Sequence, residues 1–198
     1  GMTGALRAPS LARHERKLDL MGELSAGLLL VCSNVSPHSD GDPERIAADL
    51  HAAAERAGAR GLRIGYEALA WGRHVDDHRQ AWAAVERAGH PARGLILDSF
   101  HSLARDVPIA SIASIDPARI FLVQLADAPL MRMDELFWSR HFRNMPGQGD
   151  LPVLDYVAAL EAIGYAGPYS LEIFNDRFRA GSPADIARDG RRSLLNLD

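Results

Sequence analysis

Apolar residues follow two alternating patterns along this chain of 198 residues. Short runs of about four to eight mostly apolar residues are typical of buried strands. Between them lie longer stretches in which apolar residues recur every three or four positions, as on the buried face of a helix. The strand-like runs cover residues 28–35, 62–69, 94–98, 120–125 and 169–174.

Residues that favour helix starts precede several of the helical stretches. Asp42 and Pro43 are good N-cap and first-turn residues, and Ser182 and Pro183 open the last helix in the same way. Helices that alternate with strands predict repeated βα units and a mostly parallel sheet, which is an α/β fold. The predicted helices cover residues 10–27, 43–57, 77–88, 150–163 and 182–195.

The glycine patterns of nucleotide-binding folds are absent from the sequence. No Gly-x-Gly-x-x-Gly follows the first strand-like run, and there is no P-loop. A (β/α)8 barrel matches the alternation better, but such barrels usually need ~250 residues. Five predicted strands in 198 residues therefore indicate either an incomplete barrel or a sheet that does not close.

Four predicted strands carry an oxygen-bearing side chain at or near the carboxyl end, where parallel α/β folds build their sites. Three carboxylates and an amide that converge there would repel one another unless a cation lay among them. Their hard oxygen donors favour Mg²⁺ or Mn²⁺, with Co²⁺ also possible. Each acid alone can instead cap a helix or pair with an arginine. The four residues are Glu67, Asp98, Gln124 and Glu172.

Several short motifs follow one another along the chain, at residues 66–72, 97–101, 123–127, 138–143, 146–149 and 170–175. In this order they resemble the xylose-isomerase-like TIM-barrel superfamily of sugar-phosphate isomerases and epimerases. Within that superfamily they look most like the bacterial 3-dehydroshikimate dehydratases, and Gln124, where many sugar epimerases have His, favours this group. The resemblance runs from about residue 11 to the end of the chain.

The resemblance implies roles for individual residues. Glu67, Asp98, Gln124 and Glu172 would bind a divalent metal, whereas His101, Ser139 and Arg143 would face the substrate. Two further residues, Asp127 and Asn175, lie just beyond ligand positions and are candidates for orienting them.

The implied reaction is the loss of water from 3-dehydroshikimate to give protocatechuate. A proton would leave the carbon beside the ketone, and a β-hydroxyl would then depart. His101 and Glu172 are the expected catalytic residues, with His101 as general acid and base, and Arg143 would hold the substrate carboxylate. A sugar or sugar-phosphate isomerase or epimerase is the first alternative, and a non-catalytic metal-binding barrel remnant is the second.

Members of the resembled family have two βα units before the region where this chain starts. We therefore expect one truncated TIM-barrel domain over residues 1–198, without its first two βα units. Such a barrel would expose the edge of the strand at 28–35. This exposed edge predicts a homo-oligomer in which a second copy covers the opening.

Charge and composition exclude some classes of partner. The net charge of −4 and the lack of a basic run argue against nucleic acid. No apolar run approaches the ~20 residues of a membrane span. The single cysteine, Cys32, rules out an internal disulfide, is expected to be a buried apolar residue, and suits a cytoplasmic protein.

Overall fold

The computed structural model describes residues 2–197 and divides into two compact units, the first ending at Ile96 and the second beginning at Leu97. Strand β3 (Arg93–Asp98) contributes residues to both. The other elements of the first unit are the 3-10 helix η1 (Gly4–Leu6), α1 (Arg7–Glu23), β1 (Leu28–Cys32), α2 (Pro43–Gly58), β2 (Arg63–Glu67) and α3 (His78–Ala88). Those of the second unit are α4 (Ser99–Leu103), η2 (Ile109–Ser114), η3 (Pro117–Arg119), β4 (Ile120–Leu125), α5 (Glu135–His141), α6 (Val153–Ala162), β5 (Tyr169–Leu171), α7 (Asp176–Arg179) and α8 (Pro183–Leu195).

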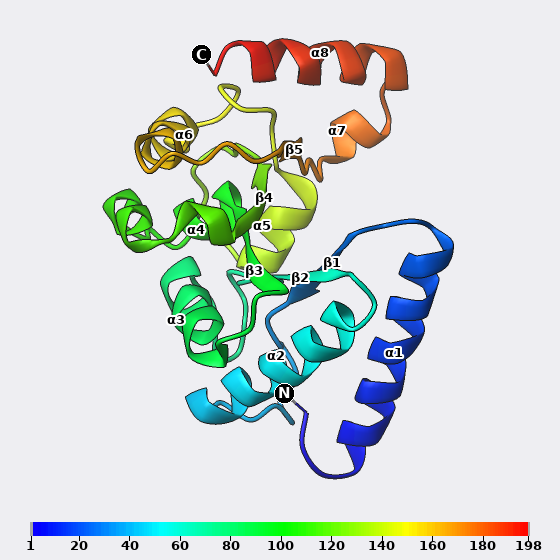
Figure 1. Cartoon of the computed structure of the whole chain (residues 1–198). Coiled ribbons are helices and arrows are strands. Elements are labelled where there is room, and N and C mark those ends of the chain that lie inside the picture. The colour runs from blue at the N-terminus through cyan, green and yellow to red at the C-terminus, as the bar shows by residue number, and fades with distance from the viewer. Residues whose placement is uncertain (1, 198) are drawn as a thin grey trace. The chain divides into compact units, whose positions relative to one another are not determined.

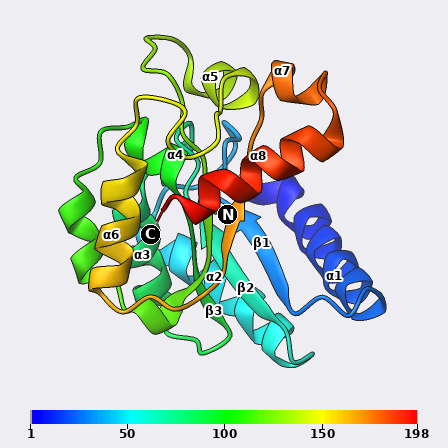
Figure 2. The same cartoon turned by 90° about the horizontal axis from the view of Figure 1, so that it is seen from above.

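The three strands of the first unit are parallel, as the alternation of patterns predicted. β1 pairs with β2, with Leu28 opposite Arg63, and β2 pairs with β3, with Tyr66 opposite Leu95. Within this unit, α2 lies between α1 and α3 (Figure 1), and the three strands run side by side (Figure 2). The predicted pairing of a second copy along the β1 edge stays a prediction.

Local capping explains where α2 and α3 begin. The Asp42 side chain accepts a hydrogen bond from the backbone N–H of Glu44 at 2.9 Å, and Pro43 is the first helical residue, as predicted. The Asp77 side chain accepts from the N–H groups of Arg79 and Gln80 in the same way. These caps satisfy N–H groups that have no partner inside the helix.

The core of the first unit is built where α1 meets α2 and β2. Leu18 and Met21 of α1 pack against Ala57 and Ile64. Leu24, which continues their helical spacing in sequence, is 68% exposed because it follows the last residue of α1, just before the chain turns. The predicted helix at 10–27 is therefore wrong at both ends, since α1 begins at Arg7 and ends at Glu23.

The first residue of α3 gives a prediction for the pH dependence of stability. Burial lowers the pKa of the His78 imidazole from 6.5 to about 4. Between these two values the unfolded chain binds more protons than the folded chain, so stability is present above pH 6.5 and is lost as the pH falls towards 4. We expect His78→Gln to remove about 2 kcal/mol of the decrease in unfolding free energy between pH 7.5 and pH 4.5.

Urea unfolding of both proteins at the two pH values measures this effect. The buried His101 is present in both proteins, so its contribution cancels from the comparison. Equal decreases in unfolding free energy for the wild type and His78→Gln would contradict the prediction.

The two strands that lie wholly in the second unit are parallel, with Gln124 opposite Ser170. β4 has the predicted bounds, but β5 stops at Leu171 rather than at Phe174. Contacts with a segment distant in sequence explain why β5 ends there. The Phe174 carbonyl accepts a hydrogen bond from the Arg143 N–H at 3.1 Å, and Phe142 and Asn175 form an isolated bridge. The residues after Glu172 therefore pair with the segment around 143 instead of extending the sheet.

Three short helices in the second unit have no counterpart among the predicted elements. α4, α5 and α7 are each one or two turns long, too short for an apolar period to be recognised. Their caps are Asp98, Asp134 and Asn175, whose side chains all accept hydrogen bonds from backbone N–H groups. Within residues 2–197, none of the helices combines the length and the apolar character that a membrane span needs.

Candidate functional site

Six of the seven residues that were predicted for the site lie in the second unit. Their side chains gather around the guanidinium group of Arg143, which is the largest fully buried side chain among the described residues. Direct contacts or short chains of hydrogen bonds link all six. They are Asp98, His101, Gln124, Ser139, Arg143 and Glu172.

Arg143 uses all three of its side-chain nitrogens. Nη1 donates to Asp98 Oδ2 at 2.7 Å and to Glu172 Oε2 at 2.9 Å. Nε donates to Ser139 Oγ at 3.0 Å, and Nη2 lies 3.3 Å from Nε2 of His101. The guanidinium thus links two carboxylates, a hydroxyl and an imidazole within the protein itself.

Two aromatic rings beside Arg143 were not predicted as part of the site. The guanidinium carbon lies 4.6 Å from the centre of the Phe100 ring and 5.6 Å from that of Phe174. Both distances are within the range of cation–π attraction. Phe100 and Phe174 each follow an acid of the site, Asp98 and Glu172, by two residues, and this repeated spacing is a signal that the sequence contained.

Asp98 combines the two structural roles that were weighed against metal binding. Its Oδ1 caps α4 by accepting from the N–H groups of Phe100 and His101, and its Oδ2 pairs with Arg143. Burial by itself would raise the pKa of the Asp98 carboxyl, but the charge of Arg143, together with that of His101 when its ring is protonated, holds that pKa below its ordinary value. Asp98 is therefore a carboxylate in a buried setting.

His101 lies in the first turn of α4 and is also buried. Burial lowers the pKa of its imidazole to about 4, so the ring is neutral at pH 7. Arg143 can only donate hydrogen bonds, so the Nε2 of His101 is the acceptor of that contact and its proton lies on Nδ1. Nε2 also lies 3.7 Å from Asp98 Oδ2.

Glu172 follows β5 directly and hydrogen bonds with Gln124 of β4. Burial and the nearby charge of Asp98 raise the pKa of the Glu172 carboxyl to about 7, although Arg143 opposes the shift. The other end of the Gln124 amide, Oε1, is buried and has no hydrogen-bond partner among the described residues. An unpaired buried oxygen on an amide that is bonded to a carboxylate fits a divalent cation that prefers oxygen ligands.

Glu67, the seventh predicted residue, is the last residue of β2 in the first unit and is buried. Its Oε2 accepts a hydrogen bond from Cys32 Sγ at 3.3 Å. The expectation that Cys32 is buried was wrong, since the thiol is exposed. Cys32 is the last residue of β1, a strand of which no residue is fully buried, so its side chain is not enclosed.

The backbone around Arg143 is held by residues that the sequence had suggested as orienters. Asn175 Nδ2 donates to the Arg143 carbonyl at 3.1 Å. Asp127 and Asn144 exchange two backbone hydrogen bonds, and the Asp127 carboxylate accepts four backbone N–H groups of the loop from 128 to 151. Asn175 and Asp127 therefore shape the segment that carries Arg143.

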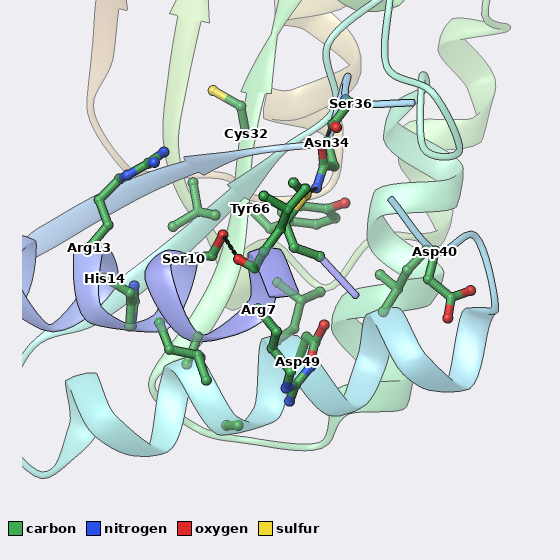
Figure 3. A pocket seen from close by; sticks show the side chains of 18 of the residues that line it. Arg7, Ser10, Arg13, His14, Cys32, Asn34, Ser36, Asp40, Asp49 and Tyr66 are labelled. Carbon is green, nitrogen blue, oxygen red and sulfur yellow. Dashed lines mark hydrogen bonds and ion pairs between the residues drawn. The ribbon is translucent and has the colours of Figure 1, made fainter. Parts of the chain in front are cut away.

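The described residues enclose a cavity in each unit, and none of the seven predicted site residues lines either of these two cavities. The cavity of the first unit has a volume of about 540 Å³ and lies between α1, α2 and β1 (Figure 3). Arg7 of α1 and Asp49 of α2 pair on its wall at 2.8 Å. The cavity of the second unit has a volume of about 840 Å³, and its lining includes Phe142 and Asn144, the two chain neighbours of Arg143. Its other lining residues are Pro129, Leu130, Met131, His141, Gln148 and residues 175–178.

Comparisons with known proteins give a consistent result. The model of the family described as xylose isomerase-like TIM barrel matches residues 2–197. A 3-dehydroshikimate dehydratase of Pseudomonas putida is 54% identical over 189 residues, which are 96% of this chain and 30% of that protein.

Two solved structures have a similar fold. A xylose isomerase-like TIM barrel/4-hydroxyphenylpyruvate dioxygenase fusion protein has a TM-score of 0.94 at 52% identity, over 98% of this chain and 31% of its own. An IolI protein with a bound zinc atom has a TM-score of 0.89 at 19% identity, over 99% of this chain and 72% of its own, which shows a shared fold alone. This chain thus spans about 30% of the length of the dehydratase and of the fusion protein, to both of which it is more than half identical.

Proposed function

Because the chain belongs to the xylose isomerase-like TIM barrel family, we propose that it carries the active site of a metal-dependent 3-dehydroshikimate dehydratase. The observation that carries the proposal is the buried cluster around Arg143, in which an acceptor imidazole, two carboxylates and an unpaired amide oxygen meet. The identity of 54% to a dehydratase of this name supports the substrate.

The proposed metal ligands are Glu67, Asp98, Gln124 and Glu172, with Mg²⁺, Mn²⁺ or Co²⁺ as the ion. Glu67 and Asp98 end two parallel strands that pair directly, β2 and β3. Carboxyl ends of neighbouring parallel strands meet at one edge of a sheet, where α/β barrels place their sites. An ion bound by these donors would supply a Lewis acid for the ketone of the substrate.

The chain's own residues supply the proton chemistry in this proposal. His101 Nε2 is an acceptor at neutral pH, so it takes the proton from the carbon beside the ketone. The imidazolium that forms returns a proton to the β-hydroxyl, which leaves as water. Ser139 and Arg143 hold the substrate carboxylate, for which a guanidinium offers two parallel donors.

An absorbance assay for protocatechuate tests the proposal. The protein would be incubated with 3-dehydroshikimate and Mg²⁺, Mn²⁺ or Co²⁺, beside the variants Glu172→Ala and Glu161→Ala, the latter an exposed glutamate of α6. We expect metal-dependent product with the wild type and Glu161→Ala and a loss of at least about 10²–10³-fold with Glu172→Ala.

Other outcomes identify the alternatives. Turnover of ketoses without aromatic product would replace the dehydratase with an isomerase or epimerase. Metal binding without turnover of either class of substrate would indicate a non-catalytic barrel. Product formation that survives in Glu172→Ala would remove this residue from the site.

A further inference from the structure

One nitrogen of Arg143 contacts both carboxylates that we propose as metal ligands in the second unit. Nη1 lies 2.7 Å from Asp98 Oδ2 and 2.9 Å from Glu172 Oε2. The two oxygens therefore point at one common cation, and that cation is part of the protein. The single positive charge of the guanidinium offsets one of the two negative charges that this pair of acids can carry.

The surroundings make the charge of Arg143 effective. The side chain of Arg143 is 1% exposed and that of Asp98 is fully buried, so water screens their interaction only weakly. A divalent ion bound by the same two oxygens would stand close to a fixed positive charge in this setting. Repulsion between the two cations would then oppose metal binding.

We propose that Arg143 is an internal counter-cation that competes with divalent metal for Asp98 and Glu172, and that Nη1 leaves these oxygens when metal binds. The inference rests on the proposed function, since it takes Asp98 and Glu172 as metal ligands. It adds a role for Arg143 before substrate arrives. Release by the metal would also free the guanidinium for the substrate carboxylate.

The backbone of Arg143 is held by hydrogen bonds that do not involve its guanidinium group. The backbone N–H donates to the Phe174 carbonyl at 3.1 Å, and the backbone carbonyl accepts from Asn175. The side chain is long, and the Phe100 ring lies 4.6 Å from the guanidinium carbon. The Phe100 ring therefore offers the guanidinium an attraction that does not depend on the two carboxylates.

Calorimetric titration with Mn²⁺ tests the competition. The proteins are the wild type, Arg143→Met, which keeps a long apolar chain without the charge, and Arg140→Met as the matched control. Arg140 lies in α5, three residues before Arg143, and its guanidinium carbon lies 4.8 Å from the centre of the Phe174 ring, but its side chain is exposed. We expect Arg143→Met to bind Mn²⁺ at least tenfold more tightly than the wild type, and Arg140→Met to bind within twofold of it.

A second measurement on the wild type keeps the proposal testable if Arg143→Met does not fold. The ¹⁵N resonances of the Arg143 side chain, identified by their loss in Arg143→Lys, would be followed during titration with Mg²⁺. We expect them to shift and their N–H protons to exchange faster with water as the ion binds. Unchanged resonances in the metal-saturated protein would overturn the proposal.

The titrations also separate this inference from the proposed function. If the wild type binds Mn²⁺ and Arg143→Met binds it equally or more weakly, the competition is wrong and the metal-dependent function stands. If neither protein binds Mn²⁺, both are wrong.

Discussion

Asp127→Ala is expected to lower the free energy of unfolding by about 3–5 kcal/mol, the range of a disrupted buried polar network. The Asp127 carboxylate is buried and accepts four backbone hydrogen bonds. Oδ1 accepts from Ala128 at 2.7 Å and Leu151 at 3.0 Å, and Oδ2 accepts from Gly147 at 3.0 Å and Gly149 at 2.9 Å. Alanine would leave these N–H groups without their acceptor inside the protein.

The loop cannot easily replace Asp127 by another contact. A Cβ atom at Gly149 would lie 2.4 Å from Asp127 Oδ1. Only glycine, which has no Cβ, therefore lets the backbone approach the carboxylate this closely. Gly147 has a φ of 79°, a conformation that side chains disfavour. The two glycines of the motif at 146–149 therefore allow the backbone to donate its N–H groups to the Asp127 carboxylate.

Urea unfolding at pH 7 measures the effect of Asp127→Ala. Asp116→Ala is the matched control, because Asp116 also accepts a backbone hydrogen bond, from Ala118 at 2.9 Å, but is exposed. We expect about 1 kcal/mol for that variant. A loss below 1 kcal/mol in Asp127→Ala would show that water or loop rearrangement satisfies the freed N–H groups.

Asp98→Asn is expected to lower kcat/KM for protocatechuate formation by at least about 10²–10³-fold, as the loss of one charge-stabilising group does. Asparagine keeps an oxygen that can cap α4 through the Phe100 N–H, now accepted by Oδ1 at 2.7 Å. It removes the negative charge that pairs with Arg143 and that we propose for the metal. The variant should therefore lose most of its kcat/KM while the cap of α4, and with it most of the free energy of unfolding, is kept.

Asp98→Ala separates the two roles. It removes the cap as well, so we expect it to unfold more easily than Asp98→Asn by about 1 kcal/mol while the activity loss is similar. The pair Asp134→Asn and Asp134→Ala is the control, since Asp134 caps α5 in the same manner through the Phe137 N–H at 2.8 Å. If Asp98→Asn kept more than a tenth of the wild-type activity, Asp98 would be a helix cap alone.

Local chemistry explains why many elements were predictable. The starts of α2 and α3 follow from single residues, Asp42 and Asp77, whose side chains bond to the next few N–H groups of the chain. β4 was predicted without error because its apolar run is bounded on both sides by polar or small residues. Such contacts join residues close in sequence, so a pattern can reveal them.

The sequence singled out the residues of the candidate site but not the contacts between them. Glu67, Asp98, Gln124 and Glu172 were predicted as metal ligands because strand ends in a parallel sheet share one edge, and this role stays a prediction. That Asp98 both caps a helix and pairs with an arginine, and that this arginine is Arg143, follows only from the fold. Asp98 and Arg143 are far apart in sequence, and the sequence contains many other arginines.

The sequence by itself determined the alternation of strands and helices, the capped helix starts, and the oxygen-bearing side chains at the strand ends, because these depend on spacing and on neighbouring residues. Only the tertiary structure decided that β5 ends at Leu171, that Cys32 is exposed and that the Asp127 carboxylate is enclosed by four N–H groups. Each of these features depends on which distant segment lies beside the residue. Burial, and with it the strength of every charge in the site, is a property of that packing.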